Sequence, residues 1–207
     1  RVDGHSAVVS SALAMMSGAD RLLGWEGEGF VTRDAKNAAR AAFDAARSPA
    51  QRRDDVEDAL RLAASEGIAA VHECGGPLLT SAGDFADVME LGRLPDLPLT
   101  VGYWAEAVTE PEQASALVSL HGAAGLAGDL NIDGSIGSHT AHLRAGYEDL
   151  PQHTGTAYRD EAGVRDHVAA CALAGVQSGF HVIGDAGMDI VLAGYEAAAR
   201  LVGWQTV

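Results

Sequence analysis

Short apolar runs of β-strand type alternate with amphipathic helical runs from residue 66 to the end of the printed sequence. Strand-type runs at Ile68–His72 and Leu99–Tyr103 are followed by helical patterns at Ser81–Leu91 and Glu110–Leu120. Two further pairs are Ala127–Ile132 with Gly163–Leu173, and Gly179–Ile183 with Met188–Arg200. Four β/α units in a row predict a parallel sheet covered by helices, which is an α/β fold.

The first 65 residues favour helices over strands. Ser6–Met16 is small and apolar, and Arg33–Arg47 is rich in alanine. A longer helix is expected from Ser48-Pro49, because serine is a good N-cap and proline suits the first helical position. We therefore divide the chain into a helical segment, residues 1–65, and an α/β segment, residues 66–207.

Composition limits the partners of the chain. A formal net charge of −15 argues against nucleic acid, whose phosphates require a basic surface. No run approaches the roughly 18 consecutive apolar residues of a membrane-spanning helix, so no membrane partner is expected. Two distant cysteines, Cys74 and Cys171, form neither a disulfide framework nor a zinc-type pair, which favours a reducing, cytoplasmic location.

Polar side chains follow the ends of the predicted strands. His72 and Cys74 end the first strand, Asp129 lies on the third, and His181 lies on the fourth. The carboxyl ends of parallel strands meet on one side of a sheet, where ligands and catalytic groups gather. Imidazole, carboxylate and thiolate are ligands of zinc and similar divalent ions. The spacing alone is not diagnostic of a metal site.

Structural explanations for these residues remain open. His72 could bond a loop carbonyl, and Cys74 could be a small buried apolar group. Asp133 could cap the turn at Asp133-Gly134, and Asp185 could cap the helix that follows it. His121 and His167 fall on predicted helices and are interpreted as surface residues.

The connection from Asp133 to Arg159 is long for an α/β protein. It is rich in glycine and proline. Loops of this length usually line a site or act as lids, so a functional role is expected here.

Three segments resemble the amidohydrolase family 3 enzymes. Arg1–His5 is similar to their R-x-D-G-H element, and Asp133–Ala141 to their D-G-S-x-G-S-x-T-A loop. His181–Asp185 is similar to their H-A-I-G-D strand. The glycine-rich loop is the most specific of the three, and the resemblance covers essentially the whole chain.

The resemblance implies a (β/α)₈ barrel of the TIM type and a divalent metal, zinc first, with manganese or iron as alternatives. Such an enzyme hydrolyses a C–N bond in an amide-type small molecule, with metal-activated water and a carboxylate that moves the proton. It implies His181 as the first metal ligand, with Asp129 and Cys74 as further ligand candidates. Asp133 is the catalytic candidate, and the substrate-binding candidates are His5, His72 and His139.

The chain also departs from the family pattern. The family commonly has a lysine, which can be carbamylated to bridge two metals, four residues before the DGS aspartate, and here that position is Asp129. The family's His-x-His pair on the first strand, a later histidine and the aspartate on the last strand have no counterpart here. Residues 66–207 then correspond to about strands two to five, so we expect a partial barrel from the interior of a larger enzyme. Its open edges would favour a homodimer.

Two other functions compete with the metal-dependent hydrolase. One is a non-catalytic binding or regulatory relative that lacks a complete metal set. The other is an unrelated α/β enzyme in which His181 and Asp185 act as a general base pair, and its activity would survive chelation.

Overall fold

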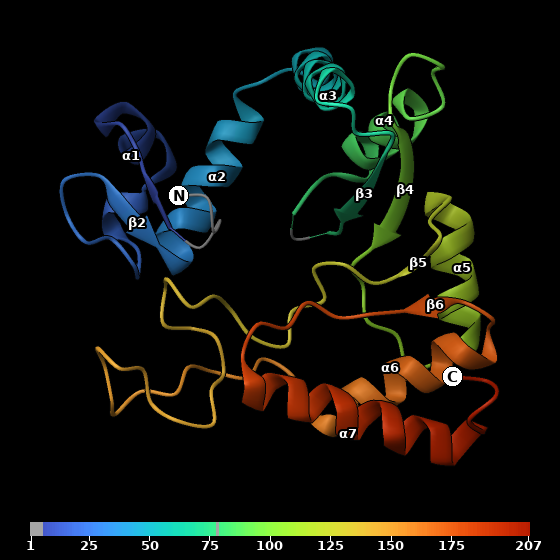
Figure 1. The fold of residues 1–207 in the computed structure, drawn as a ribbon. Helices are drawn as coiled ribbons and strands as arrows, with labels where there is room; N and C mark the ends of the chain where they lie inside the picture. The colour runs from blue at the N-terminus through green and yellow to red at the C-terminus, as the bar shows by residue number, and fades with distance from the viewer. Residues whose placement is uncertain (1–5, 78) are drawn as a thin grey trace.

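A small N-terminal unit stands beside a larger α/β unit in the computed structural model, which describes residues 6–77 and 79–207 (Figure 1). We call residues 6–45 the N-terminal unit. Its two short antiparallel strands are β1 (Ser6–Val8) and β2 (Phe30–Thr32). Its helices are α1 (Ser11–Ser17), the 3₁₀ turn η1 (Ala19–Arg21) and α2 (Arg33–Ala45).

The prediction of a purely helical N-terminal segment is wrong for the start of Ser6–Met16. Ser10 is extended and its side chain accepts a hydrogen bond from the Leu13 backbone N–H, so the helix begins only at Ser11. The residues before this cap pair with β2 instead. Gly29 allows the close approach, because a Cβ there would lie 2.3 Å from the Val9 carbonyl oxygen.

The long helix predicted after Ser48-Pro49 is confirmed as α3 (Pro49–Ser65). The Ser48 side chain accepts from the Gln51 backbone N–H, and the Gln51 side chain accepts from the Ser48 backbone N–H. This reciprocal capping box fixes where α3 begins.

The α/β unit contains the predicted parallel sheet, in the order β3-β4-β5-β6. The strands are β3 (Ala70–Gly75), β4 (Leu99–Trp104), β5 (Gly125–Leu126) and β6 (Gln177–Ser178). The helices that alternate with them are α4 (Ala82–Leu91), α5 (Pro111–His121), α6 (Glu161–Leu173) and α7 (Asp185–Val202). Sequential order with a helix after each strand confirms the predicted α/β architecture.

The last two strands are shorter and begin earlier than predicted. Instead of Ala127–Ile132 and Gly179–Ile183, regular pairing covers β5 and β6 and resumes only as a bridge between Asn131 and His181. Gly128 has φ +84°, and a Cβ there would lie 2.8 Å from the Cβ of Cys74. The chain therefore bends at Gly128 beside the end of β3, which interrupts the strand.

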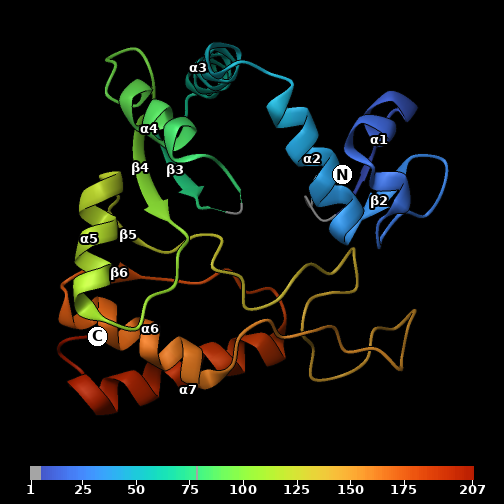
Figure 2. The ribbon, with the colours of Figure 1, turned by 180° about the vertical axis from the view of Figure 1, so that it is seen from behind.

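Helices pack on one face of the sheet (Figure 2). Trp104 on β4 is buried against Phe85 of α4, with ring centroids 5.2 Å apart in an edge arrangement. Leu99, on the opposite face of the same strand, is 59% exposed. Among the described residues, no helix is long and apolar enough to cross a membrane.

Candidate functional site

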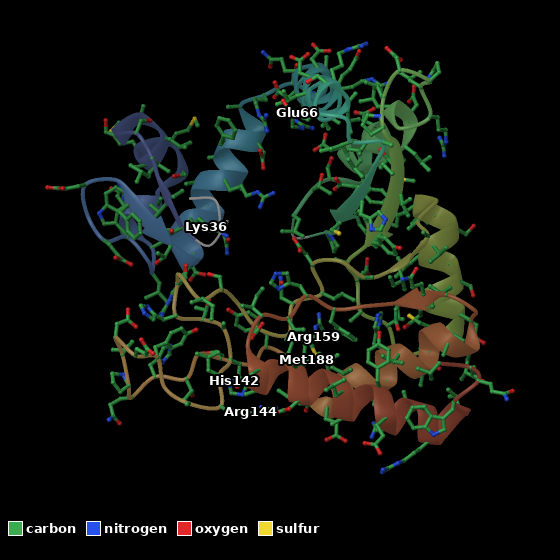
Figure 3. The ribbon with its side chains drawn as sticks, in the orientation of Figure 1. Lys36, Glu66, His142, Arg144, Arg159 and Met188 are labelled. Atoms are coloured by element: carbon green, nitrogen blue, oxygen red, sulfur yellow. The ribbon has the colours of Figure 1, made fainter. Side chains whose placement is uncertain are left out.

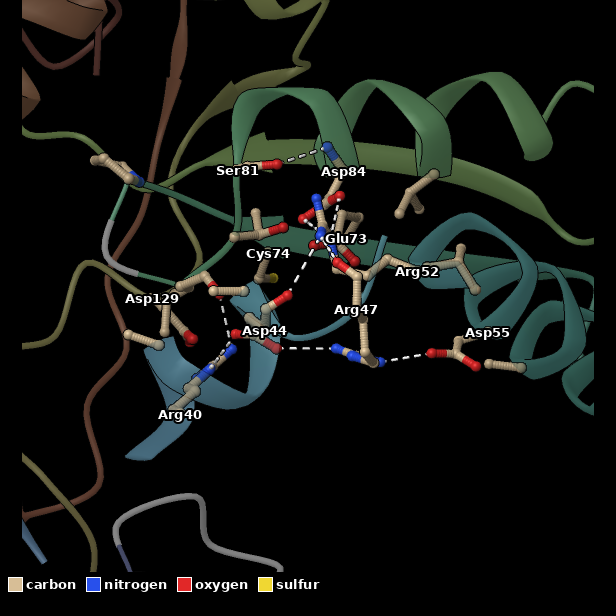
Figure 4. A pocket seen from close by; sticks show the side chains of 18 of the residues that line it. Arg40, Asp44, Arg47, Arg52, Asp55, Glu73, Cys74, Ser81, Asp84 and Asp129 are labelled. Atoms are coloured by element: carbon tan, nitrogen blue, oxygen red, sulfur yellow. Dashed lines mark hydrogen bonds and ion pairs between the residues drawn. The ribbon is translucent and has the colours of Figure 1, made fainter. Parts of the chain in front are cut away.

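A cavity of about 1090 Å³ lies between the N-terminal unit and the carboxyl end of β3 (Figure 4). Its walls come from α2, α3, the end of β3, the β3–α4 loop and α4, with Asp129 from the segment after β5. Two of the predicted ligand candidates, Cys74 and Asp129, therefore line the same space. Glu73 lines it as well, although the motifs did not single it out.

The arginines of the cavity wall are bonded to protein groups. Arg47 pairs with Asp44 at 2.9 Å and with Asp55 at 2.5 Å. Arg52 donates from Nε to both carboxylate oxygens of Asp84, at 2.9 and 3.0 Å. These contacts link the end of α2 to α3, and α3 to α4, beside the cavity.

Glu73, Asp129 and Cys74 influence one another electrostatically. Burial, and next the negative charge of Asp129, raise the pKa of the Glu73 carboxyl. Burial first, and then Asp129 and Glu73, raise the pKa of the Cys74 thiol. Cys74 is therefore a neutral thiol at pH 7 unless a cation stabilises its thiolate.

His181 lies on the continuation of β6, beside Asn131. Its carbonyl oxygen accepts from the Ile132 N–H at 2.9 Å, and its own N–H donates to the Leu130 carbonyl at 3.1 Å. These bonds fix the backbone, whereas the ring atom Nδ1 is buried without a hydrogen-bond partner. An imidazole nitrogen in this state has a lone pair or a proton available to a ligand.

Asp133 is fully buried, and its carboxylate accepts three backbone N–H groups. Oδ2 accepts from His142 and Gly184, both at 2.7 Å, and Oδ1 accepts from Ile183 at 2.9 Å. The carboxylate thus joins the start of the long loop to the segment after β6. This geometry gives Asp133 an anchoring role, and its catalytic role stays a prediction.

The long loop after Asp133 packs tightly against the start of α7. His142 and Arg144 are the loop residues that make this contact (Figure 3). A Cβ at Gly184 would lie 1.9 Å from the His142 carbonyl oxygen. Asp185 accepts a hydrogen bond from the Arg144 backbone N–H at 2.9 Å. Asp185 is the first residue of α7, and Gly184, not Asp185, occupies the N-cap position.

The substrate-binding candidates are dispersed. His139 has φ +53° and its Nε2 lies 2.9 Å from an oxygen of Asp149, so its ring is held within the long loop. His72 is exposed on the sheet and contacts the Tyr103 ring, with centroids 5.4 Å apart. His5 lies outside the described residues.

The predicted metal ligands do not assemble a centre by themselves. Within residues 6–77 and 79–207, no group of three or more His, Cys, Asp or Glu side chains is placed to hold a metal ion. The Nδ1 atom of His181 is suited to be one metal ligand, but the candidates Asp129 and Cys74 do not complete a set of ligands with it. We therefore assign no chemical step to a metal.

The surface interpretation of His167 is wrong. His167 is 1% exposed, accepts from the Val108 backbone N–H at Nδ1 (3.2 Å) and lies 3.1 Å from the Leu126 carbonyl at Nε2. Burial lowers the pKa of this imidazole. The sequence signal was its place on an apolar helix face, beside Val164, Val168 and Cys171.

Solved structures share this fold. Two uncharacterised metal-dependent hydrolases, from Pyrococcus horikoshii and Pyrococcus furiosus, match with TM-scores of 0.67 and 0.66 at 18% and 20% identity. Each match covers 94% of this chain, but only 41% and 42% of the solved chains. The chain therefore spans about two-fifths of their length.

Sequence comparison agrees with the motifs. Protein LONG AFTER FAR-RED 3 of Arabidopsis thaliana is 35% identical over 72 residues, which is 35% of this chain and 12% of the plant protein. A sequence profile of the amidohydrolase family matches residues 1–207. The chain belongs to amidohydrolase family 3.

Proposed function

We propose that this chain forms part of a metal-dependent hydrolase that cleaves a C–N bond in an amide-type small molecule. The four parallel strands would be about half of a (β/α)₈ barrel, because they run in sequential order with helices on one face. The greater length of the matched hydrolases supports this reading. In such a barrel the active site lies at the carboxyl ends of the strands.

The observation that carries the proposal is the buried, unpartnered Nδ1 of His181. A buried polar atom without a partner costs free energy, and a bound ligand that supplies the partner recovers it. A divalent ion, zinc first, would provide the missing partner. The other ligands would come largely from parts of the protein beyond the described residues, since those do not assemble a set.

The chain's other residues then have supporting roles. Asp133 holds the glycine-rich loop against the segment that carries His181. Burial and the charge of Asp129 raise the pKa of Glu73, so Glu73 is the carboxyl of the cavity that we propose as the proton carrier. The substrate would occupy the cavity beside it.

The test is metal content and hydrolysis in the complete gene product and its His181→Ala variant. We expect about one or two equivalents of metal in the unmodified protein, and loss of metal in the variant. In the His181→Ala variant, hydrolysis of N-formyl and N-acetyl amino acids or cyclic amides should fall about 100-fold or more as the metal is lost. His139→Ala is the matched control for metal content, because the His139 ring is held by Asp149. Equal metal content in the protein and in His181→Ala would contradict the proposal.

A second function, a non-catalytic binding protein, is favoured by one observation, the absence of a three-ligand group in the described part of the chain. A complete gene product that binds amide-type molecules but holds no metal and shows no turnover would support it. Turnover that survives thorough chelation would instead support the general-base alternative.

A further inference from the structure

The N-terminal unit has a hydrophobic core of its own. Its buried residues are Ala19, Val31, Ala35 and Ala39, and the apolar residues packed on them also come from this unit. The buried clusters of the α/β unit contain none of these residues. Apolar packing among the described residues therefore does not fix the N-terminal unit to the sheet.

A short elbow at residues 46–48 joins α2 to α3. Arg47 contacts Asp44 on one side of the elbow and Asp55 on the other. Arg52 donates to the Arg47 carbonyl at 2.8 Å and also pairs with Asp84 of α4. These contacts involve polar, partly exposed groups, which is a suitable setting for a pivot.

Beyond the elbow, a hydrogen bond between two described residues spans the cavity. Arg40 of α2 donates from Nη2 to the carbonyl oxygen of Leu79, in the β3–α4 loop, at 2.7 Å. The Arg40 side chain is 49% exposed, so the bond is open to water. It connects the two walls of the cavity in which Glu73, Cys74 and Asp129 lie.

We propose that the N-terminal unit is a hinged lid over this cavity, with residues 46–48 as the pivot and the Arg40–Leu79 hydrogen bond as the latch. The lid moves as a body because its core is self-contained. Release of the latch opens the cavity to a ligand without unfolding either unit. Arg40 is thus a positioning residue for the lid and is separate from the chemistry proposed above.

The chain contains its own reporter of opening. Cys74 lines the cavity and is half-buried. Cys171 is fully buried, and burial raises its pKa to about 12, so it does not react in the folded protein. At a maleimide concentration low enough that opening and closing are fast relative to labelling, the rate at which a bulky maleimide labels Cys74 therefore follows the open population.

The experiment compares Arg40→Met with Arg200→Met, in which an arginine on α7 loses its pairing with Glu196 far from the cavity. Labelling of Cys74, assigned by peptide mass spectrometry, should be about three- to tenfold faster in Arg40→Met. It should be unchanged in Arg200→Met and close to the unmodified rate in Arg40→Lys, which keeps a donor. Circular dichroism and thermal unfolding check that each variant is folded.

Equal labelling rates in Arg40→Met and the unmodified protein would overturn the proposal, as would an equal increase in Arg200→Met. A second measurement uses spin labels on Asp20→Cys and Glu112→Cys, one in each unit, with Cys74→Ala. We expect a narrow distance distribution that broadens when Arg40→Met is added. A distribution that does not change would also overturn the lid.

Discussion

Asp133 shows how one side chain can organise a whole loop. Its carboxylate accepts three backbone N–H groups from two segments of the chain: one donor lies nine residues after Asp133, and the other two lie 50 and 51 residues after it. Hydrogen bonds from backbone N–H groups to a buried carboxylate are stronger than bonds between neutral groups. The DGS motif therefore needs its aspartate for structure, whatever it does in catalysis.

Replacement of Asp133 by asparagine should destabilise the chain by about 2–4 kcal/mol. The amide would turn an NH₂ group toward backbone N–H donors, and at least one donor would lose its acceptor. Urea unfolding measures the change, with the exposed Asp149→Asn as the control. If Asp133→Asn unfolded like the unmodified protein while activity was lost, the anchoring role would be wrong and the catalytic candidate would be restored.

His167 ties three elements together. It lies on α6, accepts from Val108 in the loop after β4, and its Nε2 lies within hydrogen-bond distance of the carbonyl of Leu126 on β5. One ring nitrogen must accept and the other must donate, which is the pattern of a neutral imidazole. Protonation would remove the acceptor and place a charge in the core.

Stability should therefore fall on acidification. Burial lowers the folded pKa of His167 below its ordinary 6.5, so the unfolded chain binds the extra proton first. The contribution is fully present above pH 6.5 and declines as the pH falls toward the folded pKa, by at most about 1.4 kcal/mol per pH unit. Urea unfolding at a series of pH values between 5 and 7 measures the free energy of unfolding, and its slope against pH gives the difference in bound protons between the two states.

His167→Gln, which cannot titrate, should flatten this decline, whereas His72→Gln at an exposed position should leave it unchanged. Identical pH slopes in His167→Gln and the unmodified chain would refute the assignment.

The sequence predicts the secondary-structure elements better than their contacts. The β/α alternation is a local pattern, so the parallel order of β3–β6 followed from it. The break at Gly128 did not follow, because it depends on how closely that residue approaches Cys74. Likewise, the three hydrogen bonds that the Asp133 carboxylate accepts, and the burial of His167, depend on partners distant in sequence. The local signal for Asp133-Gly134 is only that of a turn.

For the same reason, the sequence predicts only part of the site. Strand ends were expected to bring polar groups together, and Cys74 and Asp129 do line one cavity. The wall that α2 contributes was not foreseen, because nothing in the sequence of α2 states which part of the sheet it faces.

At the scale of the whole molecule, the helices of the described part of the chain cover one face of the sheet and leave apolar side chains of the other face exposed. Thr100 and Trp104 of β4 are buried toward the helices, whereas Leu99 on the other face is 59% exposed. β3 and β6 also form the two edges of the sheet. An exposed apolar face with open edges is a surface that associates with another chain segment.

We therefore predict that the 207-residue chain in isolation self-associates with a dissociation constant on the order of 10 μM. This corresponds to a free energy of association of about −7 kcal/mol. Leu99→Glu should raise the midpoint concentration at least about tenfold, because a charge on this face must be desolvated when the face is covered. Sedimentation velocity measures the association. Leu120→Glu is the control, since Leu120 is 75% exposed at the end of α5, on the helical side. A chain that stayed monomeric over this range, or equal shifts in the two variants, would show that the open face does not drive association.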